Sequence, residues 1–167
     1  MSFYKKGINQ KTFEKLVENE KSKLYKMAFL YVKNENDALD IVQEAIYKAF
    51  ISLKSLKEPS YFSTWITRIL INTALDFIKK KKLVVPISWE KDLGDEKTEK
   101  IEDKVDLIDA IKRLEEPQRT AIILRYYKDF TVKQIAEILN CPDGTVKTHL
   151  HRAIGRLKID LKEGYMK

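Results

Sequence analysis

Both histidines of the chain lie in one C-terminal segment, GTVKTHLHRAIGRLKI, which spans residues 144–159. The same segment holds four cations and no acid. Two chemistries suit these residue types: His149 and His151 could ligate a metal, or the cations could bind nucleic-acid phosphates. Residues two apart on a helix point in different directions, and no cluster of Cys, Asp or Glu completes a metal site. We therefore predict contact with a polyanion, and neither a metal nor a cofactor.

An enzyme that cleaves nucleic acid is a further possibility for such a segment. A nuclease needs clustered carboxylates for a metal, or an acid–base pair centred on histidine. The acids of this chain are most frequent between residues 84 and 106, away from both histidines. No phosphate-binding loop, G-x-G-x-x-G or H-E-x-x-H motif occurs. We therefore expect a protein that is not an enzyme and has no small-molecule substrate.

Two helices around a short turn must position the cationic segment. In residues 131–139, TVKQIAEIL, Thr131 and Gln134 have the spacing of a capping box. After the turn NCPDG (140–144), an apolar stripe recurs at about 100° per residue: Val146, Leu150, Ile154 and Leu157. This pattern predicts a helix-turn-helix, whose second helix enters the major groove of DNA.

The outward face of that second helix carries the predicted DNA contacts. Arg152 can pair with guanine through two hydrogen bonds, and Thr148 and His151 can reach base edges or phosphates. Lys147 and the backbone amides of Gly144 and Thr145 suit phosphate oxygens. The alternative is a basic, solvated helix in a plain bundle.

Length, charge and composition describe a small helical protein with two basic parts. The 167 residues fit one domain or two small ones, with 5 Gly and 4 Pro. The net charge is +7 overall: +7 for residues 1–83, −4 for 84–106 and +4 for 107–167. Cys141 is the single cysteine, which suits a reducing compartment. No signal peptide or membrane span is evident, so we expect a cytoplasmic protein.

Apolar periodicity predicts an all-α fold with two small domains. The first domain, residues 1–83, has helical patterns over 13–32, 37–53 and 60–82. Residues 84–103 form an acidic linker without sustained periodicity. The second domain, residues 104–167, has helical patterns over 105–114, 116–127, 131–140 and 144–159.

Three of these segments together resemble the extracytoplasmic-function group of bacterial RNA polymerase sigma factors, within the sigma-70 superfamily. DALDIVQEAIYKAF (37–50) is similar to the helix with which that family docks on core polymerase. YFSTWITRILINTALDFIKKKK (61–82) is similar to its promoter-melting helix, and residues 114–158 to its −35-reading domain. The run YVKNENDALDIVQE (31–44) is most similar to the SigV-type branch.

The resemblance implies a sigma-2-like first domain that binds the β′ coiled coil of core polymerase and melts the −10 element. It implies a sigma-4-like second domain that reads −35 DNA and touches the β subunit. It also implies an anti-sigma factor, membrane-anchored in many members, that would hold the chain inactive at the inner membrane face. The residues carried over for core binding are Asp40, Ile41, Val42, Gln43 and Glu44. Those carried over for double- and single-stranded −10 DNA are Ser60, Tyr61, Phe62, Arg68, Asn72 and Lys79.

Aromatic side chains near the −10 segment have a competing explanation, which is packing in the core. Trp65 shares a helical stripe with Ile69 and is expected mainly to pack, whereas Tyr61 and Phe62 suit either role. The lysine run 79–82 stands where the family often has arginines, and lysine binds phosphate as a point charge.

The alternative function is a helix-turn-helix regulator that is not a polymerase subunit. A receiver domain would need alternating strands, and residues 1–83 show no strand pattern.

Overall fold

The computed structural model describes residues 7–84 and 102–165, and every regular element in these ranges is helical. The all-α prediction is therefore confirmed. The chain separates into two compact units, Met1–Leu75 and Asp76–Lys167. The boundary falls within the helix Phe62–Val84, most of which belongs to the first unit. Most of the predicted linker 84–103 lies outside the described residues.

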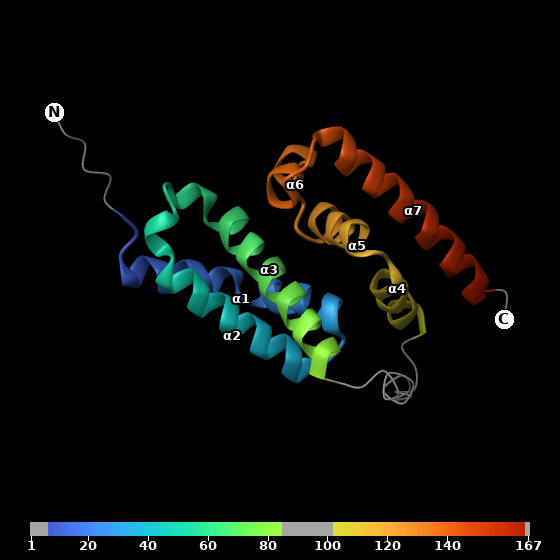
Figure 1. The fold of residues 1–167 in the computed structure, drawn as a ribbon, viewed down its shortest axis with the longest axis horizontal. Helices are drawn as coiled ribbons and strands as arrows, with labels where there is room; N and C mark the ends of the chain where they lie inside the picture. Colours follow the sequence, from blue (N-terminus) through green and yellow to red (C-terminus); the bar gives the residue numbers. More distant parts are fainter. Residues whose placement is uncertain (1–6, 85–101, 166–167) are drawn as a thin grey trace. The chain divides into compact units, whose positions relative to one another are not determined.

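The first unit is built from three helices and two short 3-10 turns, coloured blue to green in Figure 1. Its elements are α1 (Gln10–Val32), α2 (Glu35–Ile51), η1 (Leu53–Ser55), η2 (Pro59–Tyr61) and α3 (Phe62–Val84). Asparagine caps begin α1 and α2: Asn9 Oδ1 accepts the Thr12 N–H at 2.8 Å, and Asn34 Oδ1 accepts the Asp37 N–H at 2.9 Å. Lys33 ends α1 in the left-handed conformation with φ 51°, so only two residues separate the helices.

The core of this unit lies where the apolar stripes of the three helices meet. The fully buried side chains include Leu24, Met27 and Ala28 of α1, Ala38, Ile41 and Ala45 of α2, and Ile66, Leu70 and Ala74 of α3. Small alanines at 38, 45 and 49 are completely covered, which lets α2 approach α1 closely. One face of each helix is thereby committed to packing, and the opposite faces remain exposed.

Over residues 102–165, the described part of the second unit contains four α-helices and one wider helical turn. Its elements are α4 (Glu102–Arg113), α5 (Glu116–Ile122), η4 (Ile123–Tyr127), α6 (Val132–Leu139) and α7 (Asp143–Tyr165). The capping box is present at the start of α6: the Thr131 Oγ1 accepts the Gln134 N–H at 3.2 Å, and the Thr131 N–H donates to Gln134 Oε1 at 2.9 Å. Asn140 ends α6 in the left-handed conformation, with φ 51°.

Helix α5 does not run as one regular α-helix to Tyr127. The Lys128 N–H donates to Ile123 O at 3.2 Å, which closes a π-type turn over η4. The Arg125 guanidinium then donates to Phe130 O at 3.1 Å, and the Phe130 N–H donates to Leu124 O at 3.0 Å. These bonds fold the chain back sharply before α6.

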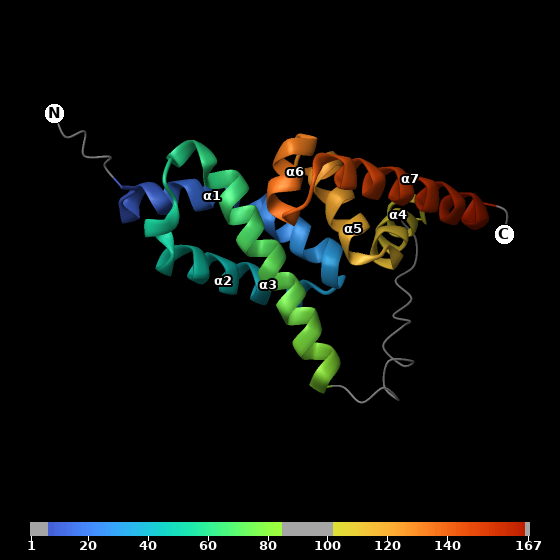
Figure 2. The same ribbon diagram turned by 45° about the horizontal axis from the view of Figure 1, so that its top comes forward.

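Helices α6 and α7 follow one another across a short turn and run in different directions, as Figures 1 and 2 both show. The inward side of α7 packs against Leu114, which lies between α4 and α5, and against Ile122 of α5. The α7 side chains in this contact are Leu150, Ile154 and Leu157. The apolar stripe predicted for the second helix is therefore confirmed. Helix α7 is longer than the predicted 144–159, because it continues to Tyr165.

Candidate nucleic-acid interface

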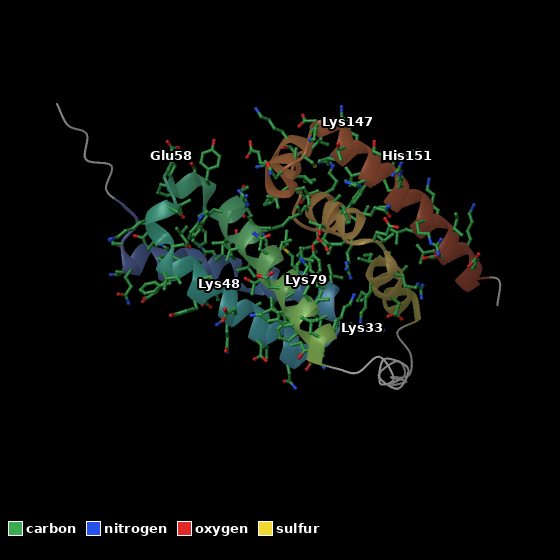
Figure 3. The ribbon with its side chains drawn as sticks, viewed as in Figure 1. Lys33, Lys48, Glu58, Lys79, Lys147 and His151 are labelled. Carbon is green, nitrogen blue, oxygen red and sulfur yellow. The ribbon has the colours of Figure 1, made fainter. Side chains whose placement is uncertain are left out.

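The exposed side of α7 carries most of the predicted −35 contacts. Lys147, Thr148, His151 and Arg152 are all exposed, and Figure 3 shows Lys147 and His151 on the outer side of the helix, away from α5. Gly144 is exposed as well, and apart from its chain neighbours and the nearby backbone of α7 no heavy atom lies within 4 Å of where a Cβ would stand. A backbone phosphate can therefore approach the first turn of α7 closely.

Thr145 differs from the other predicted contacts. Its side chain is half-buried, and its N–H donates to Pro142 O at 3.0 Å. The amide of Thr145 is thus already engaged in the first turn of α7, which leaves Gly144 as the better phosphate donor of the pair.

Thr148 has its hydroxyl proton directed inward. Its Oγ1 donates to Gly144 O at 3.0 Å, one helical turn back. The outward side of the hydroxyl therefore offers acceptor lone pairs and the side-chain methyl. These groups suit an amino group of cytosine or adenine, or the methyl group of thymine.

The two histidines lie in different surroundings, as expected for residues two apart on a helix. His151 is exposed, whereas His149 is half-buried and its Nδ1 has no hydrogen-bond partner in the part of the chain that the structure describes. Within residues 7–84 and 102–165, no group of three or more His, Cys, Asp or Glu side chains could hold a metal ion.

The residues predicted to contact −10 DNA form a track along α3. Arg68, Asn72 and Lys79 are exposed and lie within an arc of about 40° on the helix surface, calculated at 100° per residue. Tyr61, in the turn before α3, is 59% exposed. From Tyr61 to Lys79 the helix rises about 27 Å, so these residues can follow a strand rather than enclose one nucleotide.

Phe62 does not belong to this track. Its side chain is 2% exposed, and its ring lies edge-on to Phe13 with centroids 5.9 Å apart. The prediction that Phe62 contacts DNA is wrong for this structure, because the ring is part of the core of the first unit. Ser60 is exposed beside Tyr61 and remains a candidate, and Trp65 is half-buried.

The predicted docking surface on α2 also needs a correction. Asp40, Gln43 and Glu44 are exposed, and the Glu44 carboxylate lies 3.6 Å from Lys48 Nζ. Ile41 and Val42, however, are 0% and 4% exposed and pack inward, so they do not supply the apolar part of the surface.

Other large apolar side chains of α2 take that place. The apolar residues that point outward are Leu39, Tyr47, Phe50 and Ile51, which are 48%, 61%, 47% and 64% exposed. The acidic and amide side chains stand among them. A mixed surface of this kind is typical of a protein–protein contact. The spacing 39, 43, 47 and 51 was available in the sequence as a second helical stripe.

Comparison with known proteins decides the family. The family model for Sigma-70 region 2 matches residues 16–84, and that for Sigma-70 region 4 matches residues 104–157. RNA polymerase sigma factor SigV of Bacillus subtilis is 39% identical over 147 residues, which cover 87% of this chain and 88% of that protein. The chain belongs to the extracytoplasmic-function RNA polymerase sigma factors.

Further relatives agree with this sigma-factor assignment. ECF RNA polymerase sigma factor SigW of Bacillus subtilis is 31% identical, over 95% of this chain and 93% of that protein. The sigma factor RpoE of Bartonella quintana, solved in complex with the anti-sigma factor NepR, matches with a TM-score of 0.75 and 25% identity, over 91% of this chain and 98% of that one. The SigV-type prediction agrees with the 39% identity above.

As a sigma factor, the chain is a transcription-initiation subunit and not an enzyme. The comparisons favour this function over the alternative of a separate regulator. Region 2 corresponds to the helices that carry the α2 surface and the α3 track, and region 4 to those that carry the face of α7. Within the described residues, no helix has the length and apolar character to cross a membrane.

The turn between α6 and α7 of this sigma factor contains the free thiol. Cys141 is half-buried, and its N–H donates to Ala136 O at 3.1 Å. Burial, and secondarily the Asp143 carboxylate, raise the pKa of the Cys141 thiol. The thiol is therefore kept protonated and is a poor nucleophile at neutral pH.

Proposed function

We propose that this sigma factor binds core RNA polymerase through α2, follows −10 DNA along α3 and reads −35 DNA with α7. The observation that carries the proposal is the pairing, in one chain, of an exposed polar track on region 2 with exposed cations on region 4, in a stretch of α7 (residues 144–159) that contains no acid. We further propose a division into domains at residues 1–83 and 104–167, joined by the acidic segment 84–103.

The −35 contact is proposed to rest on α7. Arg152 donates two hydrogen bonds to one guanine, which gives about 1–3 kcal/mol of discrimination against other bases. Thr148 offers an acceptor or its methyl group to a neighbouring base, and His151 lies one turn above Lys147 on the same exposed side. Lys147 and the Gly144 amide bind phosphates and fix the register.

The −10 contact is proposed to begin at the turn before α3. Ser60 and Tyr61 are both exposed in this turn, and their proposed roles are to hydrogen-bond and to stack with a displaced base. Arg68, Asn72 and Lys79 then guide the backbone of the same strand along α3. Opening a duplex in this way requires cations for the phosphates and a flat group for the unstacked base.

The core-polymerase contact is proposed to combine the acids of α2 with its outward apolar side chains. Asp40, Gln43 and Glu44 provide the polar part, and Tyr47 and Ile51 provide the apolar part. Partners of this surface and of region 4 are, by resemblance, the β′ coiled coil and the β subunit.

Control by an anti-sigma factor completes the proposal. The sigma factor RpoE of Bartonella quintana was solved with its anti-sigma factor NepR, and it is similar to this chain over both regions. We propose that an anti-sigma factor, anchored in the membrane, holds this chain at the inner face of the membrane until a signal releases it into the cytoplasm.

Run-off transcription with sigma-free core polymerase on a genomic promoter library tests the proposed function. The expected result is initiation from a small set of promoters that share −10 and −35 elements. A regulator that is not a polymerase subunit would give no specific transcript unless a separate sigma factor were added, and that outcome would refute the proposal.

A further inference from the structure

The turn that carries Ser60 and Tyr61 is held at both ends by aromatic rings. Phe50, at the end of α2, lies 5.7 Å from Phe13 between ring centroids, and Phe62, at the start of α3, lies 5.9 Å from the same ring. Phe13 of α1 is 4% exposed. One buried ring therefore fixes the two ends of residues 51–61, which join α2 to α3.

Local hydrogen bonds shape the first half of this connection. The Ser52 Oγ donates to Lys48 O at 2.6 Å and helps end α2. The Ser55 N–H donates to Ser52 O at 2.8 Å, and the Leu56 N–H donates to Leu53 O at 3.1 Å. These bonds are local, so by themselves they do not set where the connection lies relative to α3.

Trp65 provides a link from α3 back to this connection. Its ring lies 5.9 Å from Phe62, and its indole Nε1–H donates to Ser55 Oγ at 3.3 Å, across ten residues of sequence. An indole has one N–H and no acceptor, so this bond uses all of its polar capacity. Trp65 was expected mainly to pack, and its half-buried ring agrees with that expectation.

We propose that Trp65 is a positioning residue for −10 recognition, because its bond to Ser55 holds the connection 51–61 in the conformation that presents Ser60 and Tyr61 to the displaced base. This inference rests on the proposed function. Residues 57–61 are all exposed and have little packing of their own. A fixed recognition loop has less conformational entropy to lose on binding, so loosening it lowers discrimination at −10 while leaving other contacts intact.

The test compares Trp65→Phe, Ser55→Ala and the double variant in transcription with core polymerase. The substrate is a promoter that the wild-type chain uses, alongside copies with single base changes in the −10 or −35 element. Phenylalanine keeps an aromatic ring beside Phe62 but removes the N–H donor together with part of the ring, whereas Ser55→Ala removes the acceptor alone. Each single variant is expected to lower −10 discrimination about two- to fivefold, the change that loss of one weak, exposed hydrogen bond gives.

The double variant is expected to lose no more than either single variant, because both remove the same bond. Discrimination at −35 and competition for core polymerase are expected to remain at wild-type values. Ser22→Ala, an exposed serine of α1, is the matched control and is expected to change none of these.

Two results would overturn the inference alone. If Ser55→Ala and Trp65→Phe leave −10 discrimination unchanged while the wild-type chain initiates specifically, Trp65 has no positioning role and the proposed function stands. If losses at −10 and −35 are equal, the effect is one of general stability. Absence of any specific initiation by the wild-type chain would instead refute the proposed function, and with it this inference.

Discussion

Thr67 of α3 is a fully buried residue whose hydroxyl has no hydrogen-bond partner among the described residues. Thr73, two turns further along the same helix, is 3% exposed, and its Oγ1 donates to Ile69 O at 2.7 Å. The two positions therefore share residue type, helix and burial, and differ in whether the hydroxyl is paired. Replacing each threonine by valine, which has nearly the same shape, isolates that difference.

The expected sizes follow from the cost of burying an unpaired polar group. Leaving a hydroxyl buried without a partner costs about 1–3 kcal/mol, and a made hydrogen bond contributes about 0.5–1.5 kcal/mol net. Valine and threonine have similar helix propensities. We expect Thr67→Val to raise the free energy of unfolding of the first unit by about 1–2 kcal/mol. We expect Thr73→Val to lower it by up to about 1 kcal/mol.

Thermal unfolding followed by the fluorescence of Trp65 measures both effects in the first unit. Trp89→Phe in all samples removes the other tryptophan of the chain. For a domain of this size, about 1 kcal/mol moves the midpoint by roughly 4–8 °C. Equal midpoints for the two valine variants would show that pairing of the hydroxyl has no effect. A lower midpoint for Thr67→Val than for the parent would contradict the reasoning.

Three further predictions concern function and chemistry. Arg152→Ala is expected to lower the preference for the matching −35 sequence about tenfold or more, with unchanged binding to core polymerase; equal loss on scrambled −35 DNA would leave Arg152 only a phosphate contact. Ile51→Glu, at a side chain 64% exposed, is expected to weaken binding to core polymerase by about tenfold or more in a competition assay, and Ser22→Glu on α1 is expected to have no effect. Iodoacetamide is expected to alkylate Cys141 more slowly than free cysteine at pH 8, because the raised pKa of the thiol leaves less thiolate. Asp143→Asn is expected to speed the reaction, and an unchanged rate in that variant would leave burial as the whole cause of the raised pKa.

Local signals predicted the second unit well. The capping box at Thr131 and Gln134 and the apolar stripe of α7 both lie within short stretches, so periodicity and spacing were sufficient to find them. The end of α7 was placed six residues early, because the prediction stopped where the acid-free stretch ended. The first acid after that stretch, Asp160, forms an ion pair with Arg156 one turn earlier, and α7 continues past it.

The side of α2 that faces outward could not be predicted from α2 alone. The helix has apolar residues over most of its circumference, and only packing against the rest of the first unit decides that Ile41 and Val42 are covered while Tyr47 and Ile51 are not. Phe62 is a similar case, because its burial depends on Phe13, which lies far away in the sequence. Long-range packing of this kind leaves no pattern in a single segment.

Asp160, the first acid after the cationic stretch, changes what α7 offers to DNA. Its side chain is 8% exposed, and its carboxylate lies 3.3 Å from Arg156 Nε and 3.8 Å from Arg113 Nε. Because Arg152 is proposed to read a base, Lys147 and Lys158 then remain as the cations of this stretch for phosphates. With about two such contacts, the logarithm of affinity falls with the logarithm of salt concentration at a slope of only about −1.8 from this helix. In the proposed −35 contact, the electrostatic part of binding by α7 is therefore small and only weakly dependent on ionic strength.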